Sequence, residues 1–291
     1  MSFKYPISLE RADMPSKIKT SLQSELQQKL DRLKEYFNNK IVVVAYSGGV
    51  DSSVLAEAGY KFAKRMIAVT ADSPTVLPGE VDEAIQLAKD RGWEHRVIQS
   101  HELEDENFVA NPHDRCYYCK KGLSKELREI ANEVSADIIV EGTNLSEIQG
   151  HRPGLQALKE SSVDAPLLIS ELTKADIREL AKFFNLPNVD KPSLACLSSR
   201  FPTGVKITPE RLKRVGLAER YILDTYLIKT LRVRDHEGLA RIEVAPEERK
   251  KLLKPDVLND INKKLREFGY NYVAIDCEGY RTGSLSEVIL D

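Results

Sequence analysis

Cysteine is scarce in this chain, which has four among its 291 residues. Four thiols are too few for the disulfide framework of a secreted protein of this size, so grouped thiols favour a metal site or catalysis in a reducing compartment. Neither sign of charge dominates, because 43 lysines and arginines face 45 aspartates and glutamates, for a net charge of −2. This balance excludes a global attraction to nucleic acid or to an anionic membrane.

Long apolar runs are missing as well. No stretch of the sequence reaches the roughly 20 residues that cross a bilayer, and residues 1–6 are too polar for a secretory signal. We therefore expect a cytoplasmic protein without a membrane partner. The chain length and the hydrophobic content of 42% predict one large core and a second, smaller one.

Residues 42–53 form the most informative stretch of the chain. The β-branched run 42–44 predicts a buried parallel strand, and the apolar periodicity after Ser47-Gly48-Gly49 predicts a helix. Glycines let the main chain approach a ligand closely, and the N–H groups at the start of a helix suit a phosphate or pyrophosphate. The hydroxyls of Ser47 and Ser52 can bind the same anion, and Asp51 can hold the Mg²⁺ that accompanies it.

The segment Ser47-Gly48-Gly49-Val50-Asp51-Ser52 resembles the PP-loop of the ATP pyrophosphatases, which cleave ATP between the α and β phosphates and adenylate a substrate oxygen. The Gly-Lys-Ser/Thr ending of a Walker loop is missing. The resemblance implies ATP and Mg²⁺ as cofactors and a role for Asp51 in catalysis. It also implies nucleotide contacts from Ser47, Gly48, Gly49 and Ser52, but it does not identify the acceptor.

The alternation of strands and helices over the first half of the chain predicts an α/β fold with a doubly wound parallel sheet. Further strands are expected at 66–70, 95–98, 137–140 and, more briefly, 165–169, with helices at 18–38, 80–91 and 123–134. Ligands bind outside the carboxyl ends of the strands in such a sheet. We therefore expect Thr70 and Asp72 to border the adenosine, and Gly142 to face the same crevice.

Pattern and charge change near Lys206. Thr208 and Pro209 are typical of a helix start, and the alternating residues 231–234 and 240–244 predict a hairpin. A helix over 255–268 and a strand over 272–276 complete a small α+β unit. We expect a PP-loop ATP pyrophosphatase domain over residues 1–205 and a C-terminal α+β domain over 206–291 that binds substrate and supports a homo-oligomer.

Three of the cysteines can act together. Cys116-x-x-Cys119 has a metal-ligand or redox spacing, and Cys196 follows in a distant loop. A thioredoxin-like role is disfavoured because the pair follows a long polar loop and not a strand. If both loops reach the crevice, three thiolates can hold a [4Fe–4S] cluster and leave its fourth iron open. Zinc with His113 or His151 as fourth ligand and a trio of unrelated core cysteines are the alternatives.

Four motifs extend the resemblance. Together they resemble the LarE family of ATP-dependent sulfur transferases, which make the nickel-pincer cofactor; the motifs are Asn111 to Lys120, Glu141 to Asn144, His151 to Gly154 and Lys191 to Arg200. Members of that family adenylate a carboxylate of pyridinium-3,5-biscarboxylic acid mononucleotide and then replace AMP with sulfur. The resemblance implies this small-molecule substrate, and Arg152 as a cofactor-binding residue.

The number of cysteines divides that family. Members with one cysteine, at the position of Cys196, give up its sulfur and are left with dehydroalanine. Members with cysteines matching Cys116, Cys119 and Cys196 hold a [4Fe–4S] cluster whose open iron carries hydrosulfide. The resemblance implies that this chain is of the second, multiple-turnover type, with inorganic sulfide as a further substrate and Cys196 in catalysis.

Two arginines follow in the C-terminal part. Arg232 and Arg234 stand two apart on a predicted strand, so they share one face and can clamp the substrate phosphate. A solvated face is the simpler alternative. The resemblance places Glu243 near this site, as an Mg²⁺ or substrate contact. One departure is Ser146-Glu147, where family members often have adjacent aspartates, which argues against a metal site there.

Three other functions fit part of this pattern. A tRNA thiolase couples the same loop and cluster to RNA, but such enzymes tend to carry extra zinc-binding cysteine pairs, for which this chain has no cysteines left. A nucleic-acid partner is therefore not expected. An amide-forming ligase of the NAD-synthetase kind has no need of clustered thiols. A cluster-bearing sulfide carrier would bind a nucleotide only as a regulator.

Overall fold

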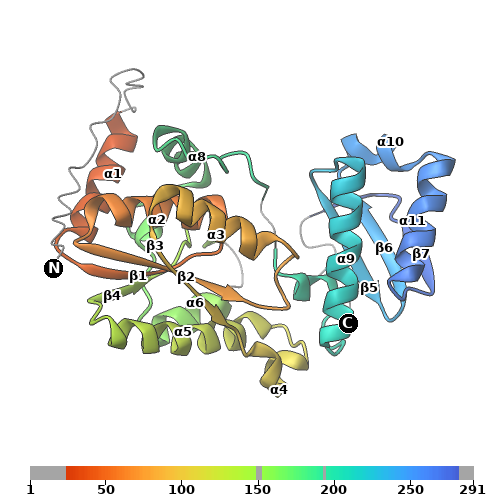
Figure 1. Cartoon of the computed structure of the whole chain (residues 1–291), viewed down its shortest axis with the longest axis horizontal. Helices are drawn as coiled ribbons and strands as arrows, with labels where there is room; N and C mark the ends of the chain where they lie inside the picture. Colours follow the sequence, from red (N-terminus) through yellow and green to blue (C-terminus); the bar gives the residue numbers. More distant parts are fainter. Residues whose placement is uncertain (1–23, 149–152, 193–194, 282–291) are drawn as a thin grey trace, which may run out of the picture.

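The computed structural model of the protein describes residues 24–148, 153–192 and 195–281 and contains two β-sheets. Figure 1 shows the larger sheet between two layers of helices, with the smaller sheet and its helices beside it. Within these three ranges, no helix combines the length and the apolar character that a membrane span requires.

The larger sheet has four parallel strands in the order β3-β2-β1-β4. Their bounds are β1 Ile41–Ala45, β2 Arg65–Asp72, β3 Glu94–Gln99 and β4 Ile138–Val140. Val43 of β1 pairs with Ile67 of β2 on one side and with Ile139 of β4 on the other. A strand with neighbours on both edges and helices on both faces needs apolar residues throughout, which explains the β-branched run. The predicted parallel α/β sheet is confirmed.

Alternate residues of β1 pack against helices on opposite faces of this sheet. Val42 and Val44 belong to a core that includes side chains from four helices: α1 (Ser24–Phe37), α2 (Val50–Phe62), α3 (Glu80–Arg91) and α8 (Lys174–Phe183). Val43 belongs to a second core with α5 (Arg115–Glu133) and α6 (Pro153–Glu160). Because side chains alternate across a strand, this short strand supports both helical layers seen in Figure 1.

The expectation of a strand over residues 165–169 is wrong, because the segment forms the short helix α7 (Pro166–Ile169). The chain bridges to β4 at Asp164 alone. Pro166 then has no N–H to offer the sheet, and its fixed φ suits the first position of a helix.

The helix expected from residue 123 starts earlier than predicted. α5 begins at Arg115, with Asp114 as its cap residue, so Cys116 and Cys119 lie in its first two turns. The tyrosines and lysines that follow Cys116 all tolerate a helix, and the preceding polar segment supplies a 3₁₀ turn and the short α4 (Glu106–Val109).

The smaller sheet has the order β5-β6-β7. β5 (Leu231–His236) and β6 (Leu239–Val244) form the predicted antiparallel hairpin, and β7 (Tyr272–Ile275) runs parallel to β6. These strands share a core with α9 (Pro209–Tyr226), α10 (Arg249–Leu252) and α11 (Pro255–Glu267). We call residues 209–281 the C-terminal unit; a domain boundary at residue 206 stays a prediction. The described residues also include the 3₁₀ turns η1 Glu102–Glu104, η2 Leu145–Glu147, η3 Leu197–Arg200 and η4 Pro246–Glu248.

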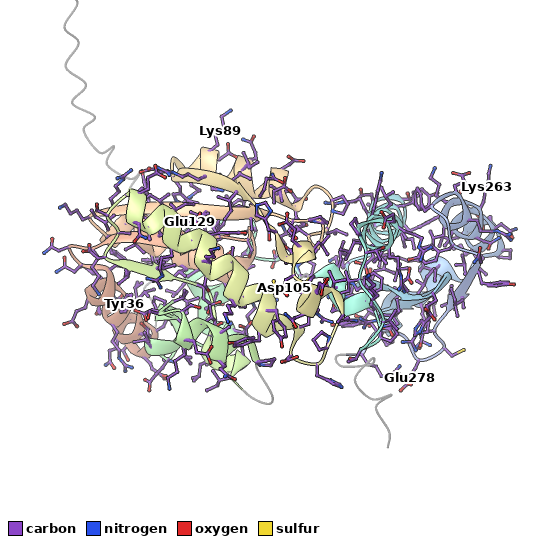
Figure 2. The ribbon with its side chains drawn as sticks, turned by 90° about the horizontal axis from the view of Figure 1, so that it is seen from below. Tyr36, Lys89, Asp105, Glu129, Lys263 and Glu278 are labelled. Atoms are coloured by element: carbon purple, nitrogen blue, oxygen red, sulfur yellow. The ribbon has the colours of Figure 1, made fainter. Side chains whose placement is uncertain are left out.

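Charged side chains project around both parts of the molecule. Figure 2 shows Lys89 and Glu129 on helices of the larger part and Lys263 on α11, and all three are exposed. The mixture of signs agrees with the small net charge of −2.

Candidate active site

The turn between β1 and α2 is stabilised by hydrogen bonds among its own residues. Gly48 has a φ of 74°, which favours glycine, and a Cβ there would lie 2.9 Å from the Cβ of Ala84 on α3. The Ser52 hydroxyl donates to the Gly49 carbonyl at 3.1 Å and accepts from the Ser47 N–H at 3.2 Å. The backbone of the turn is therefore shaped by the protein itself.

This turn leads into the N-terminus of α2. Gly49 is the cap residue and has no side chain with which to cap the helix. The first N–H groups of such a helix carry partial positive charge and suit an anion. Gly142, in the loop after β4, lies against the turn, because a Cβ there would be 3.2 Å from the Ser52 backbone nitrogen. A side chain at residue 142 would therefore crowd the anion-binding turn.

A cavity of about 420 Å³ opens at the carboxyl edge of the larger sheet. Ser47, Thr70 and Gly142 line it from the ends of β1, β2 and β4, and Leu123 and Leu158 line it from α5 and α6. Parallel α/β sheets bind their ligands at this edge. The cavity thus joins an anion-binding turn to an apolar wall that suits an adenine ring.

The two residues expected beside the adenosine have different surroundings. Thr70 lines the cavity, and its hydroxyl donates to the Tyr46 carbonyl and contacts His95 Nε2, both at 2.8 Å. Asp72 does not line it; its carboxylate accepts a hydrogen bond from Gln99 of β3 at 3.0 Å. The sequence could not separate the two, because both end the same strand.

Two of the three predicted thiol ligands line this cavity: Cys119 on α5, and Cys196 in the loop before η3. Cys116 and Cys196 are exposed, whereas Cys119 is half-buried. Burial, followed by the nearby Cys196 thiol, raises the pKa of Cys119 to about 12, so this thiol is neutral at pH 7. Cys277 is exposed in the C-terminal unit.

Cys119 and Cys196 share the cavity, whereas Cys116 is not among the residues that line it. Cys116 lies beside the start of α6. A Cβ added to Gly154 there would be 3.8 Å from the Cβ of Cys116. Across residues 24–148, 153–192 and 195–281, no three His, Cys, Asp or Glu side chains are gathered to hold a metal ion. His151, the alternative zinc ligand, and Arg152, the expected cofactor contact, lie outside the described residues.

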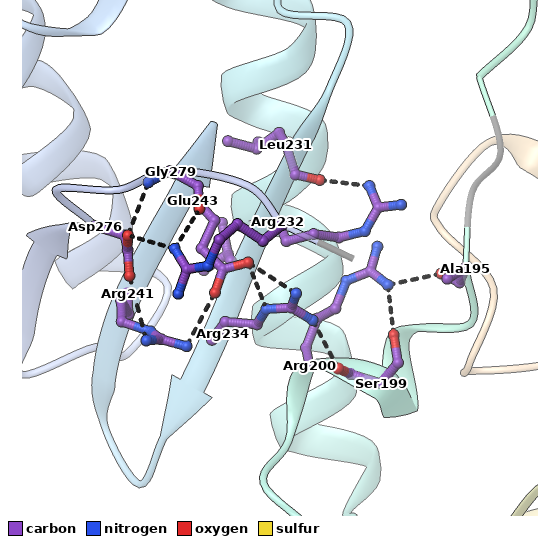
Figure 3. Close-up of polar contacts among 12 residues, drawn as sticks. Ala195, Ser199, Arg200, Leu231, Arg232, Arg234, Arg241, Glu243, Asp276 and Gly279 are labelled. Carbon is purple, nitrogen blue, oxygen red and sulfur yellow. Dashed lines mark hydrogen bonds and ion pairs between the residues drawn. The ribbon is translucent and has the colours of Figure 1, made fainter. Parts of the chain in front are cut away.

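The Cys196 loop is anchored by a buried ion pair. Arg200 donates from Nη1 to the carbonyls of Ala195 at 2.8 Å and Cys196 at 3.2 Å. Its Nε and Nη2 bind the Glu219 carboxylate of α9, each at 2.8 Å, and both side chains are almost fully buried. Figure 3 shows Arg200 reaching Ala195 and Ser199. The backbone that presents Cys196 is thereby tied to the C-terminal unit.

The arginines predicted to bind a phosphate, Arg232 and Arg234, lie on β5 of the C-terminal unit. Arg234 donates to the Ser199 carbonyl at 2.9 Å and pairs with Glu243 at 2.8 Å, and Arg241 binds the same carboxylate at 2.9 Å (Figure 3). Burial, and then the charge of Arg200, lowers the pKa of Arg232. Neither Arg232 nor Arg234 lines the cavity. Their role toward a substrate, and that of Glu243 toward Mg²⁺, stay predictions.

Lys120, Glu141 and Glu102 are among the polar cavity residues that were not predicted from the sequence. Lys120 binds Glu141 at 2.7 Å across the cavity, and the buried Glu102 accepts from Thr75 at 3.1 Å. Lys120 directly follows the second thiol of the Cys-x-x-Cys pair, which is a usable signal. Glu102 lies in a polar segment that has no such mark.

Another unpredicted residue lines a second cavity of about 300 Å³, which shares Ser47, Gly49, Asp51 and Cys196 with the first. It is Lys174, which is ion-paired with Asp51. The loop of Ser47 to Ser52 thus borders two adjoining spaces.

The parallel sheet, the glycine turn and the cavity at the carboxyl edge define an α/β protein with an enzyme-type site. No family model matches the chain. It is 32% identical to the pyridinium-3,5-bisthiocarboxylic acid mononucleotide synthase of Lactiplantibacillus plantarum over 85% of this chain and 90% of that protein. The chain therefore belongs to the family of this synthase, and it is an enzyme.

The chain is also similar to two other proteins. An uncharacterised protein of Synechocystis is 38% identical over 91% of this chain and 99% of its own length. One component of the glutamine-hydrolysing GMP synthase of Methanocaldococcus jannaschii is 28% identical over 56% of each chain. This second similarity covers only about half of each protein.

Proposed function

We propose that this protein is an ATP-dependent sulfur transferase of nickel-pincer cofactor biosynthesis. It adenylates a carboxylate of pyridinium-3,5-biscarboxylic acid mononucleotide, releases pyrophosphate, and replaces AMP with sulfur. One observation carries the proposal: Cys119 and Cys196, from distant parts of the chain, line the same cavity as Ser47 and Asp51 of the glycine turn. The name of the Lactiplantibacillus relative, a bisthiocarboxylic acid synthase, supports the acceptor.

The glycine turn would serve the first half-reaction. A carboxylate is a poor electrophile, and adenylation gives it a good leaving group. The N–H groups of α2 and the Ser47 and Ser52 hydroxyls would hold the departing pyrophosphate. Asp51 fits a metal ligand, because its Oδ1 is buried without a hydrogen-bond partner among the described residues. Mg²⁺ bound there would neutralise charge on the pyrophosphate.

The thiols would serve the second half-reaction. Three thiolates are the donor set for a [4Fe–4S] cluster with one open iron, and a cluster held by Cys116, Cys119 and Cys196 would supply a site for inorganic sulfide. Cys119 must lose its proton for this, because burial keeps its thiol neutral at pH 7. Binding both partners in one cavity makes the attack effectively unimolecular, which is worth up to roughly 7–11 kcal/mol.

Sacrifice of Cys196 is the second candidate sulfur source. It requires one accessible thiol at the cavity, and the exposed Cys196, which lines the cavity, meets this requirement. In that route the Cβ–Sγ bond of Cys196 breaks, sulfur stays on the acyl group, and loss of the α-hydrogen leaves dehydroalanine. The two routes share the adenylation step and differ in what happens to Cys196.

Anaerobic purification followed by iron and sulfide analysis, and then turnover with ATP and the pyridinium substrate, tests the proposal. The cluster route gives about four irons per chain, many turnovers with added sulfide, and iron loss in Cys116→Ala, Cys119→Ala and Cys196→Ala. Cys277→Ala is the matched control, because its thiol is exposed in the C-terminal unit and it should keep both iron and activity.

The other outcomes are equally distinct. Iron-free protein that loses the mass of hydrogen sulfide from Cys196 after one turnover establishes the sacrificial route. Pyrophosphate release that needs tRNA, or that survives in the Cys116→Ala/Cys119→Ala/Cys196→Ala protein with amide as product, contradicts sulfur transfer to a pyridinium acceptor. No pyrophosphate release with any acceptor leaves a carrier and not a transferase.

A further inference from the structure

Lys174 is directed at the glycine turn by the start of its helix. It is the first residue of α8, whose cap is fixed by a reciprocal pair: the Thr173 hydroxyl accepts from the Asp176 N–H, and the Asp176 carboxylate accepts from the Thr173 N–H. The Lys174 N–H also donates to the Ser146 hydroxyl at 3.0 Å. With its backbone held in this way, the Lys174 ammonium donates to the Asp51 carboxylate.

The Asp51 carboxylate is only half satisfied by this contact. Its Oδ2 accepts from Lys174, while its Oδ1 is buried and has no hydrogen-bond partner in the described part of the chain. A buried carboxylate oxygen without a partner is costly, so this atom is suited to a ligand that arrives later. A divalent cation prefers such oxygen donors.

Lys174 differs from the other lysine of the second cavity. Lys191 is held between Glu80 at 2.6 Å and Glu83 at 2.9 Å, so its charge is already balanced by two carboxylates of α3. Lys174 pairs with the carboxylate of Asp51, and its side chain is 33% exposed. A flexible lysine stem can therefore carry this charge from Asp51 into the cavity.

We propose that Lys174 is a counter-ion of Asp51 that exchanges places with Mg²⁺ when ATP binds. The inference rests on the proposed function, since it assumes that Asp51 serves the cation of ATP. Two cations beside one carboxylate repel each other strongly at low dielectric, so metal entry displaces the ammonium. The triphosphate then offers the ammonium a new anionic partner in the second cavity. The nucleotide-free protein thus rejects free divalent cations, and the metal enters together with ATP.

Mn²⁺ binding measured by electron paramagnetic resonance tests the exchange. In the nucleotide-free protein, Lys174→Met should bind Mn²⁺ about tenfold more tightly than the wild type, because the competing ammonium is gone. With α,β-methylene-ATP present, the same variant should bind the Mn²⁺ complex about tenfold more weakly, because the ammonium no longer reaches the phosphates. A purely structural role of Lys174 would not move the two affinities in opposite directions.

Three variants control this experiment. Lys182→Met removes an exposed lysine of the same helix that pairs with Glu179, and it should behave as the wild type. Lys174→Arg keeps the charge and should still exclude free Mn²⁺. Adding Asp51→Asn to Lys174→Met should abolish the extra Mn²⁺ affinity, because the carboxylate is removed.

Unchanged Mn²⁺ binding in nucleotide-free Lys174→Met overturns the exchange, and so does a change of the same sign with and without the analogue. If the wild type binds α,β-methylene-ATP and Lys174→Met gives either result, only the proposed exchange is overturned and the proposed function stands. A wild type that binds no ATP analogue overturns the proposed function and the exchange with it.

Discussion

At the scale of single residues, Gly48 is a position where one added methyl group should be harmful. Its φ of 74° costs a non-glycine residue about 1–2 kcal/mol, and a new Cβ would lie 2.9 Å from that of Ala84. We expect Gly48→Ala to lower the free energy of unfolding by about 1–3 kcal/mol and to weaken ATP binding. Chemical denaturation and calorimetric titration measure the two effects.

Gly122→Ala is the matched control for that substitution. A Cβ at Gly122, inside α5, would meet no atom of the described chain within 4 Å. The helix should gain up to about 1 kcal/mol from alanine, and ATP binding should not change. Equal losses of unfolding free energy in the two variants would contradict the prediction that an alanine at residue 48 strains the backbone.

Cys119 should show its raised pKa in its reactivity. Only the thiolate is alkylated, and a pKa of about 12 means that the rate rises about tenfold per pH unit between pH 7 and 10. A thiol in unfolded chain, with a pKa of about 8.5, levels off above about pH 9. Iodoacetamide labelling of cluster-free Cys116→Ser protein, followed by mass spectrometry, gives the Cys119 rate without interference from its neighbour.

The slope with pH separates charge from access, because slow diffusion into the cavity lowers the rate equally at every pH. The denatured protein provides the reference curve. A native Cys119 rate that levels off near pH 9 would show that burial does not raise the pKa of this thiol above its ordinary value.

At the scale of elements, the link between η3 and α9 should be worth more than an exposed ion pair of the same geometry. Arg200 and Glu219 have 1% and 0% of their side chains exposed. Arg200→Met would leave a buried carboxylate without its cation, and we expect a loss of about 3–5 kcal/mol in unfolding free energy. Arg200→Met/Glu219→Leu should recover part of this loss, because neither charge then remains. Denaturant unfolding measures all three proteins.

Arg65 and Glu94 provide the comparison, since they form a two-pronged pair with 44% and 40% of their side chains exposed. Solvent screens such a pair, so Arg65→Met should lower the unfolding free energy far less than Arg200→Met does. Similar losses in Arg200→Met and Arg65→Met would mean that the buried pair does not hold the Cys196 loop in place.

Several elements were predictable because their signals are local. The β-branched run of β1, the Thr208-Pro209 start of α9 and the alternation of β5 and β6 each carry their own pattern. Residues 165–169 misled because a short apolar run fits a strand or a helix equally well, and Pro166 decides only through its missing N–H. α5 was predicted too short because its first turns hold cysteines and tyrosines, which have no strong helix preference.

At the scale of the whole molecule, those parts of the site could be predicted whose functional residues lie close together in the sequence. The glycine turn and the Cys-x-x-Cys pair are examples, and the structure brings Cys119 and Cys196 to the cavity of Ser47. Contacts across the chain could not be predicted. Lys174 and Asp51 are 123 residues apart, and nothing near either residue indicates the other. Arg200 and Glu219 were equally hidden, because charged residues on a helix usually face solvent.

The anchoring of Cys196 has a consequence for how the protein is made. Translation releases the larger sheet first, whereas Glu219 and Arg234, which bind Arg200 and the Ser199 carbonyl, emerge from the ribosome later. A nascent chain therefore exposes the Cys196 segment before it has the means to hold it. The Cys196 loop therefore reaches its final position only after Glu219 and Arg234 have been synthesised.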